Sequence, residues 1–272
     1  MTPAWAVPIV ETPPFTTTAG AADSSVILHV PHSSTRIPAD ARESILLDDA
    51  AFSMELARIT DAHTDVLARE AAGDAWLFIN QCSRLVVDPE RFPDDREEMN
   101  AVGMGAVYTA TSQRETLRLP DPERDARLID KYFHPYAQAL TDLVDRRLAR
   151  CGRAVILDIH SYPAEPLPYE LHIELRRPAI CLGVDETHTP AWLVDAARES
   201  LGPVGECLVN EPFIGTYAPL KHYGTDTRVS SIMVEIRRDI YGEPDGSLSD
   251  RRTDLVTGLA RLVGEVAQYA RG

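Results

Sequence analysis

Short apolar runs recur along the chain, and longer segments with apolar side chains at helical spacing lie between them. The runs with the length and composition of buried strands are Val26–Val30, Trp76–Ile79, Arg84–Val87, Ala154–Leu157, Ile180–Val184, Gly205–Val209 and Ser231–Ile236. The helical segments are 48–72, 121–150, 189–201 and 250–271. This alternation predicts an α/β fold, a three-layer α/β/α sandwich around a mixed, mainly parallel sheet.

The domain organisation predicted from the same pattern is simple. Residues 1–24 are rich in proline and read as an irregular N-terminal arm, and residues 25–272 read as a single domain because no Gly/Ser-rich linker divides them. Residues 89–122 contain four prolines and predict a long excursion over the sheet edge.

Composition narrows the class of protein. The formal net charge of −15 argues against nucleic acid or an anionic membrane as a partner. We find neither a signal peptide nor an apolar run of about 20 residues, which favours a cytoplasmic protein. The four cysteines form no CxxC pair and are expected to be reduced; Cys82 as a nucleophile is disfavoured because no family signature surrounds it. No oligomeric state is indicated.

Polar side chains stand at the ends of three predicted strands. His32 follows the first strand, His160 follows Leu157 with Asp158 two residues before it, and Glu235 lies near the end of the last strand. Because strand ends open into the ligand crevice of open α/β sheets, these residues predict a hydrolytic zinc site. Each also has a plain structural explanation, and for Glu235 it is an ion pair with a neighbouring arginine.

The third ligand of such a site is left open by the residues alone. Asp61, His63 and Asp65 lie within five positions, and on a helix Asp61 and Asp65 share one face while His63 points away. Asp158 is a further candidate, either as a ligand or as support for a metal-bound imidazole. For Asp65 the alternative is a solvated helix face.

Substrate contacts are predicted from arginines and from one loop. Arg84 and Arg91 flank Asp88, and a guanidinium suits the recognition of a substrate carboxylate, although Asp88 can hold one of them. His222 and Tyr223 lie in a loop and can donate hydrogen bonds to a developing oxyanion.

At this point the sequence resembles the N-formylglutamate amidohydrolase (N-formylglutamate deformylase) family from about residue 26 to residue 241. The motifs that carry the resemblance are His29-Val30-Pro31-His32-Ser33-Ser34, Thr60-Asp61 with Thr64-Asp65, Ser83-Arg84-Leu85-Val86-Val87-Asp88, Asp158-Ile159-His160-Ser161, His222-Tyr223-Gly224 and Val234-Glu235. Their order and spacing are specific only in combination. The resemblance implies a phosphorylase/hydrolase-like fold similar to that of the zinc carboxypeptidases.

The resemblance also implies roles for individual residues. It makes His32, His160 and Asp61 ligands of a divalent metal, with Zn²⁺ expected, and Glu235 the general base. It puts His222 and Tyr223, with the substrate-binding residues Arg84, Arg91 and Asn210, around a small-molecule substrate. The implied reaction is hydrolysis of an N-formyl or related N-acyl amino acid. The expected substrate is N-formyl-L-glutamate, which is hydrolysed to formate and L-glutamate in histidine degradation.

One departure keeps alternatives open. Family members carry Asp-Leu-Asn-Arg where this chain has Asp88-Pro89-Glu90-Arg91, and Glu90 changes the charge beside a substrate-binding arginine. The alternatives are a metal-binding homologue without turnover, and a deacylase or peptidase that acts on another substrate.

Overall fold

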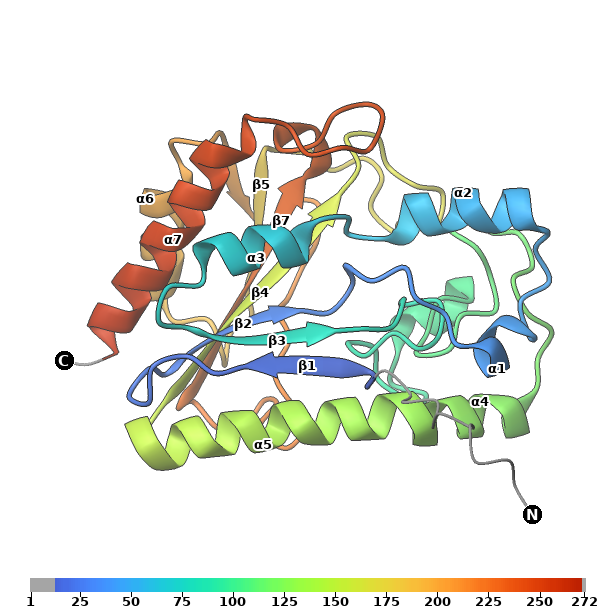
Figure 1. Ribbon diagram of the computed structural model, residues 1–272, viewed down its shortest axis with the longest axis horizontal. Coiled ribbons are helices and arrows are strands. Elements are labelled where there is room, and N and C mark those ends of the chain that lie inside the picture. Colours follow the sequence, from blue (N-terminus) through green and yellow to red (C-terminus); the bar gives the residue numbers. More distant parts are fainter. Residues whose placement is uncertain (1–12, 271–272) are drawn as a thin grey trace, which may run out of the picture.

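A computed structural model describes residues 13–270 and contains one seven-stranded sheet (Figure 1). The strand order is β1-β3-β2-β4-β7-β5-β6. β2 pairs in parallel with β3 and β4, β4 with β7, and β5 with β6, whereas β1–β3 and β5–β7 are antiparallel. The prediction of a mixed, mainly parallel sheet is therefore confirmed. The strands are β1 (Phe15–Thr18), β2 (Val26–Val30), β3 (Trp76–Asn80), β4 (Ala154–Tyr162), β5 (Ile180–Gly183), β6 (Cys207–Val209) and β7 (Val229–Arg237).

Helices cover both faces of this sheet, which confirms the three-layer α/β/α arrangement. On one face α5 packs Tyr136, Leu140 and Val144 onto β2–β4, and on the other α3, α6 and α7 bury a larger apolar cluster (Figure 1). The helices are α1 (Ala39–Arg42), α2 (Asp49–Ile59), α3 (Thr64–Ala71), α4 (Pro122–Leu128), α5 (His134–Cys151), α6 (Ala191–Leu201) and α7 (Arg252–Tyr269). Short helical turns of other types are η1 (Glu98–Val102), η2 (Ile129–Phe133) and η3 (Arg238–Ile240). No helix in the described part of the chain has the length and apolar character needed to cross a bilayer.

The central strand β4 is longer than the sequence predicts. All nine of its residues are buried, including Asp158, His160 and Ser161, beyond the predicted end at Leu157. Buried strands normally read as apolar runs because both sheet faces are covered. These polar residues remain in the strand because other side chains bond to them, as described below.

The predicted helix 48–72 is wrong in one respect, because it divides into α2 and α3. His63 has a left-handed backbone with φ of 66°, which interrupts helical pairing. The backbone N–H of Asp61 donates instead to the carbonyl oxygen of His32 at 3.0 Å. The break fixes Asp61 against the chain segment that carries His32.

Two other predictions of local structure are also wrong. Arg84–Val87 forms a turn, in which the N–H of Val86 bonds to the oxygen of Ser83, so it adds no strand to the sheet. The edge position is taken by β1, which lies within the arm predicted to be irregular over residues 1–24. Residues 1–12 of that arm lie outside the described residues. The division of the chain at residue 24 stays a prediction.

Candidate active site

A cavity of about 530 Å³ opens where β2, β4 and β7 end. Its floor includes His32, His160 and Glu235. Segment 84–99, the loop 163–172 after β4, and the loop 212–223 before β7 supply its walls. The carboxyl ends of parallel strands meet at one edge of a sheet, so this position follows from the topology.

Strand pairing sets the relative positions of the central residues. In the parallel register His160 of β4 lies beside Glu235 of β7, and Asp158 lies beside His29 of β2. His32 comes two residues after β2 and turns toward His160, with ring centroids 5.0 Å apart. The structure thus brings these strand-end side chains together at one edge of the sheet.

Three nitrogen and oxygen atoms face one another at the floor. The Nδ1 atoms of His32 and His160 are 3.2 Å apart, and Asp61 Oδ2 lies 3.2 Å from the Nδ1 atom of His160 and 3.7 Å from that of His32. Ligand atoms at a tetrahedral zinc ion, with bonds of ~2.0–2.2 Å, lie about 3.3–3.6 Å apart. The triangle therefore has the dimensions of three zinc ligands.

The opposite ring edges have carboxylate partners. His32 Nε2 is 2.9 Å from Asp88 Oδ1, and His160 Nε2 is 3.1 Å from Asp158 Oδ2. Asp158 is in turn 2.8 Å from His29 Nδ1. With the ring protons on the Nε2 atoms that face these carboxylates, as is usual for metal-bound histidines, both Nδ1 atoms carry lone pairs. Two facing lone pairs beside the carboxylate of Asp61 repel one another unless a cation lies among them, so the donor set fits a divalent metal.

Among the candidates for the third position, Asp61 is the residue that reaches the histidines. His63 Nε2 lies 2.8 Å from the carbonyl oxygen of Gly246 and is exposed. Asp65 lies 3.9 Å from Arg69 on α3. Asp158 meets His160 on the Nε2 edge, so it supports the imidazole from behind.

The loop that carries Asp61 is held from the far end of the chain. Arg238 donates to the carbonyl oxygen of Arg58 at 2.8 Å, and the Tyr241 hydroxyl donates to that of Ala62 at 2.7 Å. Arg238 also lies 3.3 Å from Asp61 Oδ1, which leaves Oδ2 facing the histidines. Segment 238–246 thereby sets the orientation of the carboxylate.

Glu235 is a buried carboxyl group without an ion-pair partner in residues 13–270. The predicted alternative, a pair with Arg237 or Arg238, is wrong, because Arg237 bonds Asp239 and Arg238 bonds Asp61. Its Oε2 atom is buried and accepts no hydrogen bond from the described residues. Burial raises the pKa of Glu235 to about 7. A carboxyl group with such a pKa accepts and returns a proton near neutral pH.

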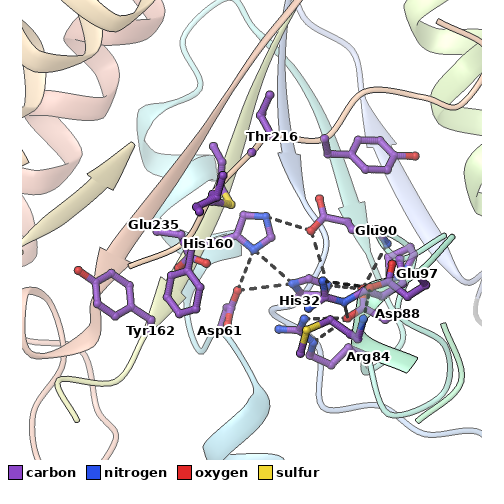
Figure 2. A pocket seen from close by; sticks show the side chains of 18 of the residues that line it. His32, Asp61, Arg84, Asp88, Glu90, Glu97, His160, Tyr162, Thr216 and Glu235 are labelled. Atoms are coloured by element: carbon purple, nitrogen blue, oxygen red, sulfur yellow. Dashed lines mark hydrogen bonds and ion pairs between the residues drawn. The ribbon is translucent and has the colours of Figure 1, made fainter. Parts of the chain in front are cut away.

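The sequence suggested that Glu90 changes the charge beside Arg91, but the Glu90 side chain contacts histidines instead. Its Oε2 atom lies 3.2 Å from His160 Nε2 and 3.8 Å from His32 Nε2. His32, Glu90 and His160 therefore form another group able to hold a metal, on the opposite ring edges. Figure 2 shows Asp61 and Glu90 on opposite sides of His160. The Nδ1 side fits an ion better, because Asp88 already occupies His32 Nε2.

The two predicted substrate-binding arginines differ in how tightly they are held. Arg84 donates to Asp88 Oδ2 from Nη2 at 2.7 Å and from Nε at 3.2 Å, and also to the Tyr108 hydroxyl. Burial opposes ionisation of Asp88, but Arg84 and His32 hold its pKa well below the usual range. Arg91 lies 3.7 Å from Asp88 and 3.8 Å from Glu97, and its Nε atom lacks a hydrogen-bond partner among the described residues. Arg91 is therefore the freer of the two for binding an anion.

Two predicted residues lie away from the cavity. His222 is held between Asp145 of α5, at 3.0 Å, and Asp226, at 3.3 Å, and its ring does not line the cavity. The Asn210 side chain accepts from the backbone N–H groups of Val184 and Gly215 and is used in the loop structure. Tyr223, by contrast, lines the cavity and is 40% exposed.

Sequence reasoning missed His29 and the role of Asp88 as a partner of His32. The His29 ring is completely buried between Asp158 and the Tyr136 hydroxyl. The sequence could have indicated a polar contact for His29, because a histidine within a fully apolar strand requires a buried polar partner. The apolar wall formed by Phe213 and Ile214 gave no local signal.

Comparisons with known proteins agree with this geometry. The N-formylglutamate amidohydrolase family matches residues 24–242. The structure is similar to an N-formylglutamate amidohydrolase from Ralstonia eutropha JMP134, with a TM-score of 0.79 and 25% identity over 95% of this chain and 98% of that one. A gene product from Agrobacterium tumefaciens shares the fold, with a TM-score of 0.71 and 19% identity over 95% and 96% of the two chains. No curated protein matches at a significant level.

Replacing Asp88 tests the buried ion network. Asp88→Ala removes the partner of the buried Arg84 and of His32 Nε2, and we expect it to lower the free energy of unfolding by about 3–5 kcal/mol. Urea unfolding measures the change. Asp94→Ala is the control, because the Asp94–Arg96 pair lies on the surface and its loss should have little effect. Equal effects of the two variants would contradict a stabilising role for the network.

Proposed function

Because the chain belongs to the N-formylglutamate amidohydrolase family, we propose that it hydrolyses the amide of an N-formyl or related N-acyl amino acid with a divalent metal, first of all zinc. The proposed ligands are His32 Nδ1, His160 Nδ1 and Asp61 Oδ2. The observation that supports this most strongly is the triangle of these three atoms at zinc-ligand spacing beside the unpaired Glu235. The family name makes N-formyl-L-glutamate the substrate to test first.

Zinc held there would lower the pKa of a water toward ~7 and polarise the scissile carbonyl. Glu235 accepts a proton from the attacking water as the new C–O bond forms. The same carboxyl group then gives the proton to the amine nitrogen as the C–N bond breaks, so that formate, or another carboxylate, and the amino acid are the products. The raised pKa of Glu235 suits both transfers.

Other residues position the substrate in this proposal. Arg91, whose contacts with Asp88 and Glu97 are long, binds a substrate carboxylate, while Arg84 holds Asp88 and through it the ring of His32. Tyr223, at the cavity wall, can donate its hydroxyl to the substrate, a role that the placement of His222 does not support. Asn210 has no part in catalysis here, because its amide is used by the backbone.

The zinc content of single variants distinguishes the proposed ligands from neighbouring residues. Wild-type protein should bind roughly one zinc ion per chain, and Asp61→Ala or His160→Ala should lose most of it together with activity. Asp65→Ala is the matched control from the start of α3, because Asp65 pairs only with Arg69 among the described residues, at 3.9 Å, and it should keep its zinc. Atomic absorption after dialysis measures the content. Full zinc retention by both ligand variants would place the metal elsewhere.

Glu235→Gln should keep the fold and the zinc but lose about 10²–10⁴-fold in kcat, because general-base catalysis contributes that much. Hydrolysis of N-formyl-L-glutamate and of other N-formyl amino acids gives the rate, and zinc content gives the control. A near wild-type rate would assign the proton transfers to another group. Zinc binding without hydrolysis of any compound by the wild type would instead favour the metal-binding homologue without turnover.

Lysine substitutions of Arg91 and Arg84 should have different effects, the first on KM and the second on stability. Arg91→Lys should raise KM about tenfold, because an ammonium group cannot reproduce the paired hydrogen bonds of a guanidinium to a carboxylate. Arg84→Lys should instead lower the melting temperature, because it weakens the bonds to Asp88 and Tyr108. An unchanged KM in Arg91→Lys, with a raised KM in Arg84→Lys, would reverse the two roles.

A further inference from the structure

Glu90 supplies a carboxylate to the cavity floor without a cation of its own. Its side chain is 15% exposed and lines the cavity, and its Oε1 atom is buried and lacks a hydrogen-bond partner among the described residues. Arg91, the next residue, lies against Asp88 and Glu97. No ion pair between Glu90 and an arginine or lysine occurs in residues 13–270.

The three histidines that Glu90 faces are each closer to another carboxylate. His32 Nε2 is 2.9 Å from Asp88, His29 Nδ1 is 2.8 Å from Asp158, and His160 Nε2 is 3.1 Å from Asp158. The corresponding distances to Glu90 are 3.8, 3.5 and 3.2 Å. Glu90 therefore shares all three histidines with other carboxylates and has no arginine or lysine partner among the described residues, so a second carboxylate beside it would meet a like charge.

Among the arginines that line the cavity, one is available to bind a substrate carboxylate. Arg91 makes only long contacts with Asp88 and Glu97, at 3.7 and 3.8 Å, whereas Arg84 is held by Asp88 and Arg238 by Asp61. Arg58 and Arg96 also line the cavity, with side chains that are 39% and 63% exposed, and they lie 4.0 Å from Glu55 and 2.7 Å from Asp94. A substrate with two carboxylates would place the second one near Glu90 or against a solvated arginine that already has a partner.

Large apolar side chains also line the cavity. Phe213, Ile214, Leu171 and Leu220 line it, and the last three keep 64%, 43% and 43% of their surface exposed. Large apolar side chains at a rim favour an apolar ligand group. A volume of about 530 Å³ is in the range that encloses ligands larger than N-formyl-L-glutamate.

We propose that this site prefers N-acyl amino acids with a single carboxylate and an uncharged, apolar side chain, and that Glu90 is the residue that excludes a second carboxylate. Repulsion between like charges in a partly desolvated cavity is the physical basis of the exclusion. The inference rests on the proposed function, because it assumes amide hydrolysis at this floor.

The test compares substrates that differ in one property. Zinc-loaded wild-type enzyme is assayed for kcat/KM with the N-formyl derivatives of L-glutamate, L-glutamine and L-leucine. Glutamate and glutamine have nearly the same shape and differ in charge, so their ratio reports charge exclusion. We expect glutamine to exceed glutamate by about tenfold or more, and leucine to exceed glutamine.

Glu90→Gln should raise the glutamate-to-glutamine ratio about tenfold. A ratio measured on one enzyme preparation cancels differences in zinc content or folded fraction. Glu98→Gln is the matched control, because Glu98 also lines the cavity but makes no ion pair with the histidines, and the ratio should change less than twofold. Ile214→Ser should lower kcat/KM for the leucine derivative and leave that for glutamine nearly unchanged.

The outcomes separate this inference from the function on which it rests. A wild-type preference for the glutamate derivative, or an unchanged ratio in folded Glu90→Gln, overturns the inference while hydrolysis itself supports the function. If Glu90→Gln does not fold, the wild-type ratio alone decides. Absence of hydrolysis with all three compounds overturns the proposed function and this inference together.

Discussion

Parallel pairing of β4 with β2 and β7 is the constraint on which the rest of this structure depends. It places His160 beside Glu235, and it brings the residues after β2 to the same sheet edge. A shift of one residue would turn every side chain of β4 to the other face. Burial of apolar side chains on both faces of β4 opposes such a shift, so the core fixes the geometry of the polar site.

The cost of burying so many charged groups is offset by connecting them. Asp88 accepts from His32, Arg84 and Tyr108, and Asp158 is shared by His29 and His160. Such contacts fix the ring orientations before any ligand arrives, which is the arrangement expected of metal-binding histidines. Among residues 13–270 Glu235 makes no ion pair, the Glu90 carboxylate pairs only with histidines that other carboxylates share, and both residues line the cavity.

Local sequence patterns predicted most strands, the helical layers and the residues at the cavity floor. They did so because strand ends, apolar periodicity and proline positions are local properties. The break between α2 and α3 was missed because the helical pattern continues through Thr60–His63, and contacts with His32 and with segment 238–246 override it. His222 and Asn210 were misplaced for a related reason: a loop motif gives the residue types but not the direction in which a side chain points. The position of Glu90 depends on the turn that begins at Arg84, where the sequence predicted a strand over Arg84–Val87.

The bracing of the Asp61 loop by Arg238, Tyr241 and Gly246 has a consequence for how the protein is made. During synthesis from the N-terminus, β2 and the Asp61 loop emerge long before these residues do. The loop therefore stays without its supports until residues 238–246 have also been made. A nascent chain that stops before residue 238 carries all three proposed metal ligands but lacks the contacts that orient the third. Competence to hold a metal would then arise only after this later segment has folded against the loop.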